Sequence, residues 1–258
     1  MASMVVPESL RSYLHSVVGY HEVMAPQAVH HGLPSPYLTV VLAFDQPLDC
    51  GWMRGREDRA RYWTCAAGLH TAPALIRTHG FQYGIQLSLT PRGARALLGL
   101  PASALAGAMT TSEDLPYGVG PDLHARLAEA PDWPTRWQVL TEAFTTRFLG
   151  DTGARPEVDR AWQLLMRSDG RARVSEIADH VGWGRRRLLR EFRAEYGVGP
   201  KEAAMTMRFD RAVRSVRAGG SLAEVAAGCG YADQAHMTRD FTVLGGGTPL
   251  GLREPWIA

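Results

Sequence analysis

One helical pattern occurs twice between residues 174 and 244, with the copies about 47 residues apart, and it constrains the fold more than any other feature. The first copy comprises Val174–Trp183 and Gly184–Phe192, and the second comprises Ser221–Tyr231 and Ala232–Phe241. In each copy a Glu-Ile-Ala or Glu-Val-Ala segment precedes a glycine and then an apolar-x-Arg-x-Phe segment. Glycine supplies the backbone freedom that a sharp turn between two helices requires. Two copies are too few for a solenoid, so the sequence predicts a tandem pair of helix-turn-helix units.

The apolar positions of both units recur at helical spacing, which separates a buried face from an exposed face. In the first unit the pattern predicts a core of Ile177, Ala178, Val181, Leu188 and Phe192. In the second unit it predicts a core of Ala223, Val225, Ala226, Met237 and Phe241. Between the units, Pro200 opens a predicted helix that runs to about Ala218 and is stopped by two glycines. Such a helix would hold the two units rigidly against each other.

Residues 157–254 resemble the DNA-binding domain of the AraC/XylS family of bacterial transcription regulators. The resemblance is carried by Phe192–Pro200, Arg208–Ala212, Val225–Gln234 and Thr248-Pro249 ahead of Arg253. It implies an all-helical domain that places two recognition helices in successive major grooves on one face of double-stranded DNA. Gly184 departs from the family, which usually has Ser or Thr at this helix N-cap. That change costs about a few tenths of a kcal/mol.

The expected DNA contacts lie on the exposed faces of the second helix of each unit. Arginine, glutamine and histidine side chains can bond to base edges, and a leucine can touch a thymine methyl group. The residues predicted to contact bases are Arg186, Leu189, Arg190, Gln234, His236 and Arg239, and those predicted to contact phosphates are Arg185, Arg187 and Thr238. Arginine serves both purposes, so phosphate contact stays open for Arg186 and Arg190. The net charge of +2 says little about nucleic acid, but residues 171–193 hold seven arginines against three acids.

The first half of the chain is predicted to be mostly antiparallel β. Leu38–Phe44 is an apolar run between turn residues, and Phe81–Leu89 alternates with a period of two. Further strands are predicted at 13–24, 61–67 and 74–78, and helices at 92–98, 102–106, 122–130 and 135–149. The predicted class is therefore α+β: an antiparallel β barrel or sandwich with trailing helices, followed by an all-α domain with two helix-turn-helix units. Residues 84–99 also resemble the N-terminal domain of actinobacterial AraC-like regulators, which brings no ligand with it.

A chain of 258 residues that is 45% hydrophobic can bury two cores. We expect an N-terminal sensing or dimerisation domain at 1–150, a linker at 151–157 and the DNA-binding domain at 158–258. The three cysteines show no paired spacing, and neither a signal peptide nor an apolar run of about 18 residues occurs. These features predict a cytoplasmic protein with no membrane partner.

The N-terminal half offers candidate effector-binding residues and candidate metal ligands. Five aromatic residues at strand positions could line an effector pocket, although such residues more often form a core: Trp52, Tyr62, Trp63, Phe81 and Tyr83. The histidines at 30, 31, 70 and 79 lack a His-x-His pattern with a downstream Glu and His. We therefore predict polar strand residues there, with no metal and no cofactor.

The leading hypothesis is a sequence-specific transcription regulator whose N-terminal domain binds an effector or mediates self-association. The alternative keeps the DNA-binding function but makes the N-terminal domain a protein–protein interaction module with no small-molecule ligand. An enzyme is not expected, because no cysteine lies in a Pro-Cys-His-like setting and no Ser/His/Asp order stands out. RNA polymerase and a second copy of the chain, as a homodimer, are the other expected partners.

Overall fold

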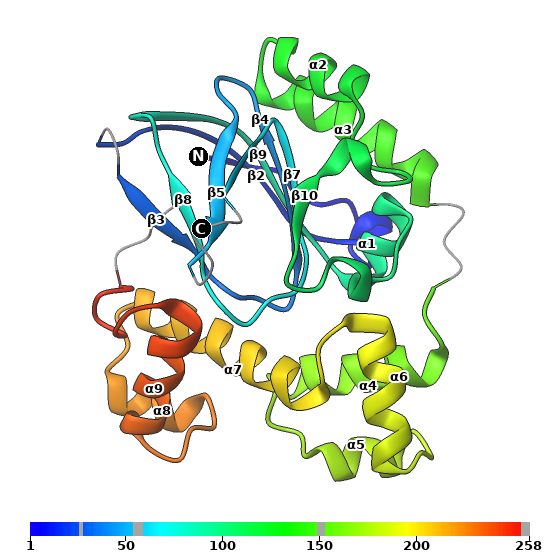
Figure 1. The fold of residues 1–258 in the computed structure, drawn as a ribbon, viewed down its shortest axis with the longest axis vertical. Coiled ribbons are helices and arrows are strands. Elements are labelled where there is room, and N and C mark those ends of the chain that lie inside the picture. The colour runs from blue at the N-terminus through cyan, green and yellow to red at the C-terminus, as the bar shows by residue number, and fades with distance from the viewer. Residues whose placement is uncertain (26–27, 54–58, 149–152, 254–258) are drawn as a thin grey trace.

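The protein consists of two antiparallel β-sheets followed by helices (Figure 1). The structure, a computed structural model, describes residues 1–25, 28–53, 59–148 and 153–253. The large sheet has the strand order β1-β2-β9-β4-β7-β10, and the small sheet has the order β3-β8-β5-β6. All pairings are antiparallel, and the described strands do not close into a barrel. The predicted α+β class is therefore confirmed, with two separate sheets rather than a closed barrel.

The elements divide along the chain into a strand-rich part and a helical part. The strands are β1 (Ala2–Ser3), β2 (Leu14–Val23), β3 (Val29–Gly32), β4 (Leu38–Ala43), β5 (Leu48–Trp52), β6 (Ala60–Tyr62), β7 (Thr64–Ala67), β8 (Ala74–Arg77), β9 (Phe81–Leu89) and β10 (Met109–Thr111). The α-helices are α1 (Pro91–Leu98), α2 (Pro121–Glu129), α3 (Trp133–Phe148), α4 (Pro156–Arg167), α5 (Val174–His180), α6 (Arg185–Tyr196), α7 (Pro200–Arg217), α8 (Leu222–Gly228) and α9 (Gln234–Gly245), and the 3-10 helices are η1 (Glu8–Leu10), η3 (Ala102–Leu105) and η4 (Ser112–Asp114). Within the described chain, none of these helices combines the length and the apolar character needed to cross a membrane.

The strand predicted at 61–67 is two strands, because the chain leaves one sheet and enters the other at Trp63. Strand β6 pairs with β5 in the small sheet, whereas β7 pairs with β4 and β10 in the large sheet. The strands β1, β3, β5 and β10 were not predicted, since two to five residues carry too little alternation to be recognised.

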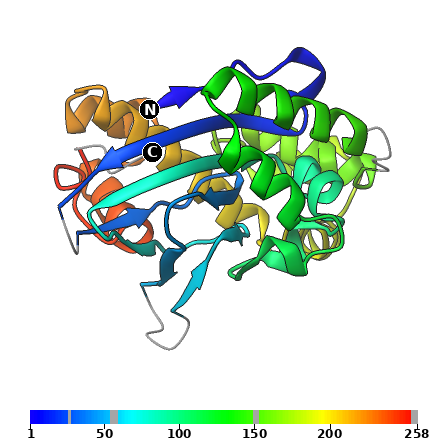
Figure 2. The ribbon, with the colours of Figure 1, turned by 90° about the horizontal axis from the view of Figure 1, so that it is seen from above.

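The two faces of the large sheet differ in character because successive side chains of a strand point to opposite sides. On the outer face, Ile85 and Leu87 are fully buried beneath the helices, and α3 lies across the sheet (Figure 2). Trp133 of α3 packs so closely over Gly19 that a Cβ at position 19 would lie 2.2 Å from its ring. On the inner face the register aligns Val41 with Cys65 and Gln86, which mixes apolar and polar side chains.

Helix α7 connects the two helix-turn-helix units, α5–α6 and α8–α9, and passes below the sheets (Figure 1). Its Phe209 lies 5.0 Å from Phe241 of α9, edge to face, in the core of the second unit. The predicted core residues of both units are buried with two exceptions: Val181 is half-buried and Ala223 is exposed. The prediction for Ala223 was wrong because α8 buries Val225 and Ala226, while Leu222 at its start packs partly against the same cluster.

Candidate nucleic-acid interface and ligand cavity

Helix α6 directs its predicted contact residues to solvent. Arg185, Arg186 and Arg190 are exposed, and Leu189 is 41% exposed. The opposite side of the helix is buried through Leu188 and Phe192. Gly184 is the N-cap and contributes no side-chain hydrogen bond, so the first amide groups of α6 are not capped by a side chain. The exposed face is a basic surface with one apolar residue in it.

Two arginines of α6 are already held by neighbouring side chains. The Arg187 guanidinium lies over the Trp183 ring, 4.4 Å from its centroid. Arg190 donates a hydrogen bond of 2.7 Å to Glu191, and this bond lowers the pKa of the Glu191 carboxyl. This ion pair lies on the protein surface and is of a kind that contributes little to stability.

Helix α9 presents a less basic face than α6. Gln234 and Arg239 are exposed, whereas His236 and Thr238 are half-buried. Thr238 donates from Oγ1 to the Gln234 carbonyl at 2.9 Å, so its hydroxyl is partly occupied within the helix. The ring of His236 packs edge to face against Tyr231 at 5.2 Å, and its Nδ1 accepts from the Ala232 amide at 3.4 Å.

Asp233 caps α9 and was missed by the sequence analysis. Its carboxylate accepts a hydrogen bond of 2.6 Å from the His236 amide. Aspartate is among the most favourable N-cap residues, and its place directly before Gln234 was the available signal. The two recognition helices thus differ at their first turns, since Gly184 offers no such bond to α6.

The N-terminal part contacts the C-terminal ends of both recognition helices. Arg95 of α1 forms an ion pair of 2.7 Å with Glu195 of α6. Ser103 donates a 2.7 Å hydrogen bond to the carbonyl of Ala194 in α6. At the other unit, Nδ1 of His31 on β3 lies 2.9 Å from the carbonyl of Gly245, where α9 ends. The N-terminal part therefore contacts both units, at separate places.

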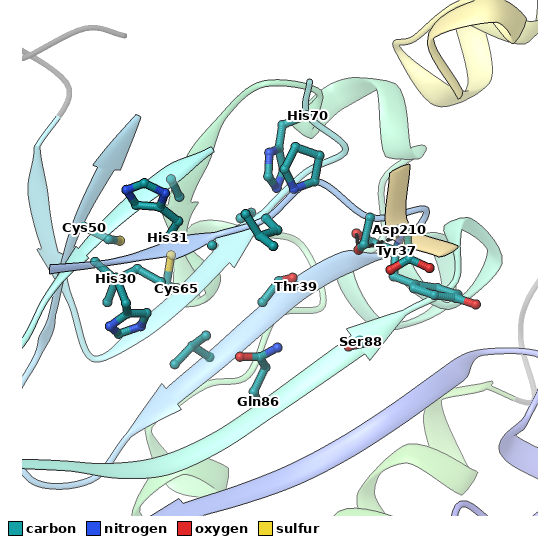
Figure 3. A pocket seen from close by; sticks show the side chains of 18 of the residues that line it. His30, His31, Tyr37, Thr39, Cys50, Cys65, His70, Gln86, Ser88 and Asp210 are labelled. Atoms are coloured by element: carbon teal, nitrogen blue, oxygen red, sulfur yellow. Dashed lines mark hydrogen bonds between the residues drawn. The ribbon is translucent and has the colours of Figure 1, made fainter. Parts of the chain in front are cut away.

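A cavity of about 300 Å³ lies between the two sheets and α7 (Figure 3). The inner face of the large sheet supplies one wall, which includes Thr39, Gln86 and Ser88. The small sheet supplies His30 and His31, and α7 supplies Phe209, Asp210, Val213, Arg214 and Arg217. The volume is at the lower end of the range for small-molecule sites. The contribution of α7 was not anticipated, although residues 210, 213, 214 and 217 share one side of a helix by their spacing.

None of the five aromatic residues proposed from the sequence lines this cavity. Tyr83 instead packs against Trp133 of α3 at 5.9 Å, since the odd-numbered positions of β9 face the helices and the even-numbered ones face the cavity. Trp63 is 47% exposed, and Phe81 contacts His21 at 5.0 Å. Tyr62 packs against the cluster that contains Cys50 and Cys65, and Trp52 lies 4.7 Å from His70, so these two adjoin lining residues.

Two histidines of the cavity are held in the neutral form. Burial lowers the pKa of His30 to about 4, and this side chain is 4% exposed. Its Nδ1 has no hydrogen-bond partner within the described part of the chain. Burial also lowers the pKa of His70 to about 4, and its Nδ1 lies 2.7 Å from the Ala72 carbonyl. His79, the fourth histidine considered, does not line the cavity.

The end of the cavity formed by α7 carries one positive charge in excess. Arg214 donates to Asp210 at 3.0 Å, which neutralises both groups. Arg217 has no carboxylate within 4 Å among the described residues, and burial lowers the pKa of its guanidinium. Nearby, His15 stacks on Tyr37 with a centroid distance of 3.9 Å. This end is suited to an anionic group.

The opposite end of the cavity contains sulfur atoms. Cys50 and Cys65 are both free and buried, and Met109 lies beside them. A hydrogen bond with Cys50, together with burial, raises the pKa of the Cys65 thiol. In the described ranges, no three side chains drawn from His, Cys, Asp and Glu are grouped to hold a metal ion.

Two helix-turn-helix units joined by one helix, with exposed arginines on a recognition helix, define a DNA-binding protein of two parts. Residues 177–254 match the family model described as a helix-turn-helix domain. The C-terminal part of the chain therefore carries a helix-turn-helix domain of the AraC type. No curated protein matches it in sequence.

Solved structures are similar to the whole chain or to a part of it. ToxT from Vibrio cholerae is 11% identical, with a TM-score of 0.56, over 91% of this chain and 97% of that one. A structure of wild-type ToxT with bound unsaturated fatty acid is also 11% identical, with a TM-score of 0.54, over 92% and 94%. An AraC-type regulator from Chromobacterium violaceum is 24% identical, with a TM-score of 0.36, over 38% and 89%. At these identities the ToxT structures establish the fold of this chain.

Proposed function

We propose that this regulator binds a specific operator through α6 and α9 and that a small organic acid in the cavity controls this binding. The observation that carries the proposal is the position of α7. This helix forms one wall of the cavity through Asp210, Val213 and Arg217, and it joins the two helix-turn-helix units. A ligand in the cavity would contact both α7 and the sheets, so its contacts would change if α7 moved relative to the sheets. A ligand shifts a conformational equilibrium only when it binds the two conformations with different affinity.

The chemistry of the cavity supports an acid with an apolar body. The excess positive charge of Arg217 would attract a carboxylate. Val41, Ile76 and Val213 would contact an apolar chain. One of the similar structures is described as ToxT bound to an unsaturated fatty acid, which agrees with this class of ligand.

On the DNA, Arg186, Leu189, Arg190, Gln234, His236 and Arg239 are proposed to contact bases, and Arg185, Arg187 and Thr238 to contact phosphates. The proposal includes a β-rich sensing or dimerisation domain at 1–150, a linker at 151–157 and the DNA-binding domain at 158–258, although residues 151 and 152 lie outside the described residues. RNA polymerase and a second copy of the chain belong to the proposal as partners at the promoter.

A footprint on the DNA upstream of the protein's own gene, at two salt concentrations and with and without an unsaturated fatty acid, tests this proposal. We expect a discrete protected stretch that survives moderate salt and changes when the acid is added. Arg217→Gln should keep the footprint and lose the response to the acid, whereas the exposed Arg126→Gln of α2 should keep both. Protection that is diffuse and disappears with salt would contradict specific operator binding. A footprint that ignores every acid tested, together with a co-purifying partner, would favour a protein-interaction role for the N-terminal part.

A further inference from the structure

The imidazole of His236 is held in one orientation in the first turn of α9. Its Nδ1 accepts a hydrogen bond from the Ala232 amide at 3.4 Å. Its ring packs edge to face against Tyr231, with 5.2 Å between the centroids, and Tyr231 is only 6% exposed in the core of the second unit. The amide of His236 donates to the Asp233 carboxylate at 2.6 Å, which fixes the backbone that carries the ring. Contacts within the protein therefore orient both the ring and its backbone before DNA is bound.

The contact with Ala232 determines which ring nitrogen of His236 carries the proton. A neutral imidazole has one N–H donor and one acceptor nitrogen. A backbone amide only donates, so Nδ1 is the acceptor of this hydrogen bond and carries no proton. A proton on Nδ1 would place two N–H groups against each other. The proton of the neutral ring is therefore on Nε2.

The protonated nitrogen Nε2 is available to a partner outside the protein. It forms no hydrogen bond with the residues that the structure describes, and it is not one of their buried polar atoms without a partner. The atom therefore reaches solvent, although the residue as a whole is half-buried. His236 lies three residues before the exposed Arg239, so the two side chains share one side of α9.

We propose that His236 acts as a fixed hydrogen-bond donor, which selects an acceptor atom on a base edge through Nε2. In the major groove the acceptors are N7 of both purines, O6 of guanine and O4 of thymine, whereas the amino groups of adenine and cytosine are donors. A ring fixed in this tautomer bonds to the acceptors and not to the amino groups. This role rests on the proposed function, which makes His236 a base contact, and it adds which atoms of the base the ring can contact.

The fixed tautomer makes His236 reject some base edges as well as accept others. An amino group opposite Nε2 would leave two buried donors facing each other, and a buried donor without an acceptor is costly. Gln234, which is exposed at the start of the same helix, has both a donor and an acceptor in its amide and lacks this restriction. His236 therefore restricts the second half-site in a way that Gln234 does not.

Nitrogen-15 NMR of the full chain, with both ring nitrogens of histidine labelled, tests the tautomer in the absence of DNA. The signals of His236 are identified by their loss in His236→Gln. At a pH where the ring is neutral, we expect the long-range nitrogen–proton correlations of a ring protonated at Nε2. The pattern of a ring protonated at Nδ1, or exchange between the two tautomers, would overturn the proposal. This measurement is made on the wild type, so it decides the tautomer even if a variant used with DNA does not fold.

Operators with single altered bases test the contact itself. In the operator defined by footprinting, purine N7 is removed, or guanine O6 or thymine O4 is replaced by sulfur, at one position at a time. We expect one such change in the second half-site to weaken wild-type binding about three- to tenfold, which corresponds to the loss of one hydrogen bond. The same change should have no effect on His236→Phe, which keeps a ring against Tyr231 but has no N–H group. His236→Gln, whose amide can donate from a position close to that of Nε2, should keep the sensitivity.

The first half-site provides the matched control for these operators. Because α6 contacts that half-site, the wild type and His236→Phe should respond equally to changes there, and circular dichroism shows whether the variant is folded. Equal responses in the second half-site as well, with specific binding intact, would overturn the role of His236 and leave the proposed function standing. Absence of any discrete footprint would overturn the proposed function and the base contact with it, whichever tautomer the NMR spectrum shows.

Discussion

Arg190 of α6 is held by an ion pair in the free protein, and the proposed function also gives it a contact with DNA. In the free protein its guanidinium bonds to Glu191, which also lies 3.7 Å from Arg155. Its 71% side-chain exposure leaves the remaining donors free for a guanine edge. The ion pair fixes the direction of a long side chain, and ordering it beforehand reduces the entropy lost when it binds.

We predict that Arg190→Ala weakens binding to the specific operator by ~1–3 kcal/mol and relaxes the preference at one base position. A competition assay with operators randomised at single positions measures both effects. Arg185→Ala, on the same helix, provides the comparison, since loss of a phosphate contact lowers affinity for all sequences about equally. If Arg190→Ala weakens random and specific DNA to the same extent, Arg190 contacts phosphate.

The buried His30 should make folding stability depend on pH. Its pKa is about 4 in the folded protein and 6.5 when exposed, so below pH 6.5 the unfolded chain binds the proton more readily. The free energy of unfolding is therefore unaffected by His30 above pH 6.5 and decreases as the pH falls from 6.5 toward 4. Urea unfolding of the wild type and His30→Gln from pH 7 to pH 4 should show the wild type losing roughly 2–3 kcal/mol more than the variant. Parallel curves would show that His30 titrates equally in both states.

At the scale of elements, the two recognition helices begin differently. Asp233 bonds to the first turn of α9, whereas Gly184 leaves α6 without a side-chain cap. A Cβ at position 184 would meet nothing within 4 Å, and the backbone there has an extended conformation that serine adopts freely. The first turn of α6 can therefore accept a cap without any rearrangement of its surroundings.

Substitutions at these two caps should act in opposite directions. Asp233→Ala should lower the free energy of unfolding by about 1 kcal/mol, and Gly184→Ser should raise it by a few tenths of a kcal/mol. Chemical denaturation followed by circular dichroism measures both. A loss of stability in Gly184→Ser would mean that the start of α6 is constrained by something other than its missing cap.

The helical elements were predicted more fully than the sheets, for a physical reason. A helix such as α7 repeats its apolar positions over 18 residues and has Pro200 at its start, so the pattern and the boundary agree. Strands such as β10, with three residues, are defined by partners distant in sequence. The residues that line the cavity were not predicted for a related reason. The apolar alternation of β9 identifies the face that packs on α3, while Gln86 and Ser88 on the other face look like ordinary polar strand residues. Neither the cluster that contains Cys50 and Cys65 nor the Arg95–Glu195 ion pair can be predicted from sequence spacing.

For the whole molecule, the proposed binding mode makes the length of α7 set the spacing of the DNA half-sites. An 18-residue helix is about 27 Å long, and successive major grooves on one face lie about 34 Å apart. One chain should therefore cover on the order of 20 base pairs.

Insertions between the half-sites test this spacing. We expect that adding about 5 base pairs, which moves one half-site to the opposite face, leaves only one half-site protected. Adding about 10 base pairs restores the face but doubles the separation, and it should also fail, because α7 cannot lengthen. Footprints on the three operators distinguish the outcomes, and full protection on the longest one would show that the units move independently.

The position of Phe209 on α7 limits how this protein could be engineered as a biosensor. Phe209 belongs both to the cavity wall and to the packing of the second helix-turn-helix unit against Phe241. Reshaping that wall to accept a new analyte would therefore disturb operator choice at the same time. Thr39, Gln86 and Ser88 also line the cavity, but they lie on strands β4 and β9 of the large sheet rather than on α7. If the cavity binds the proposed acid, a library confined to the strands would change the ligand preference without altering α7.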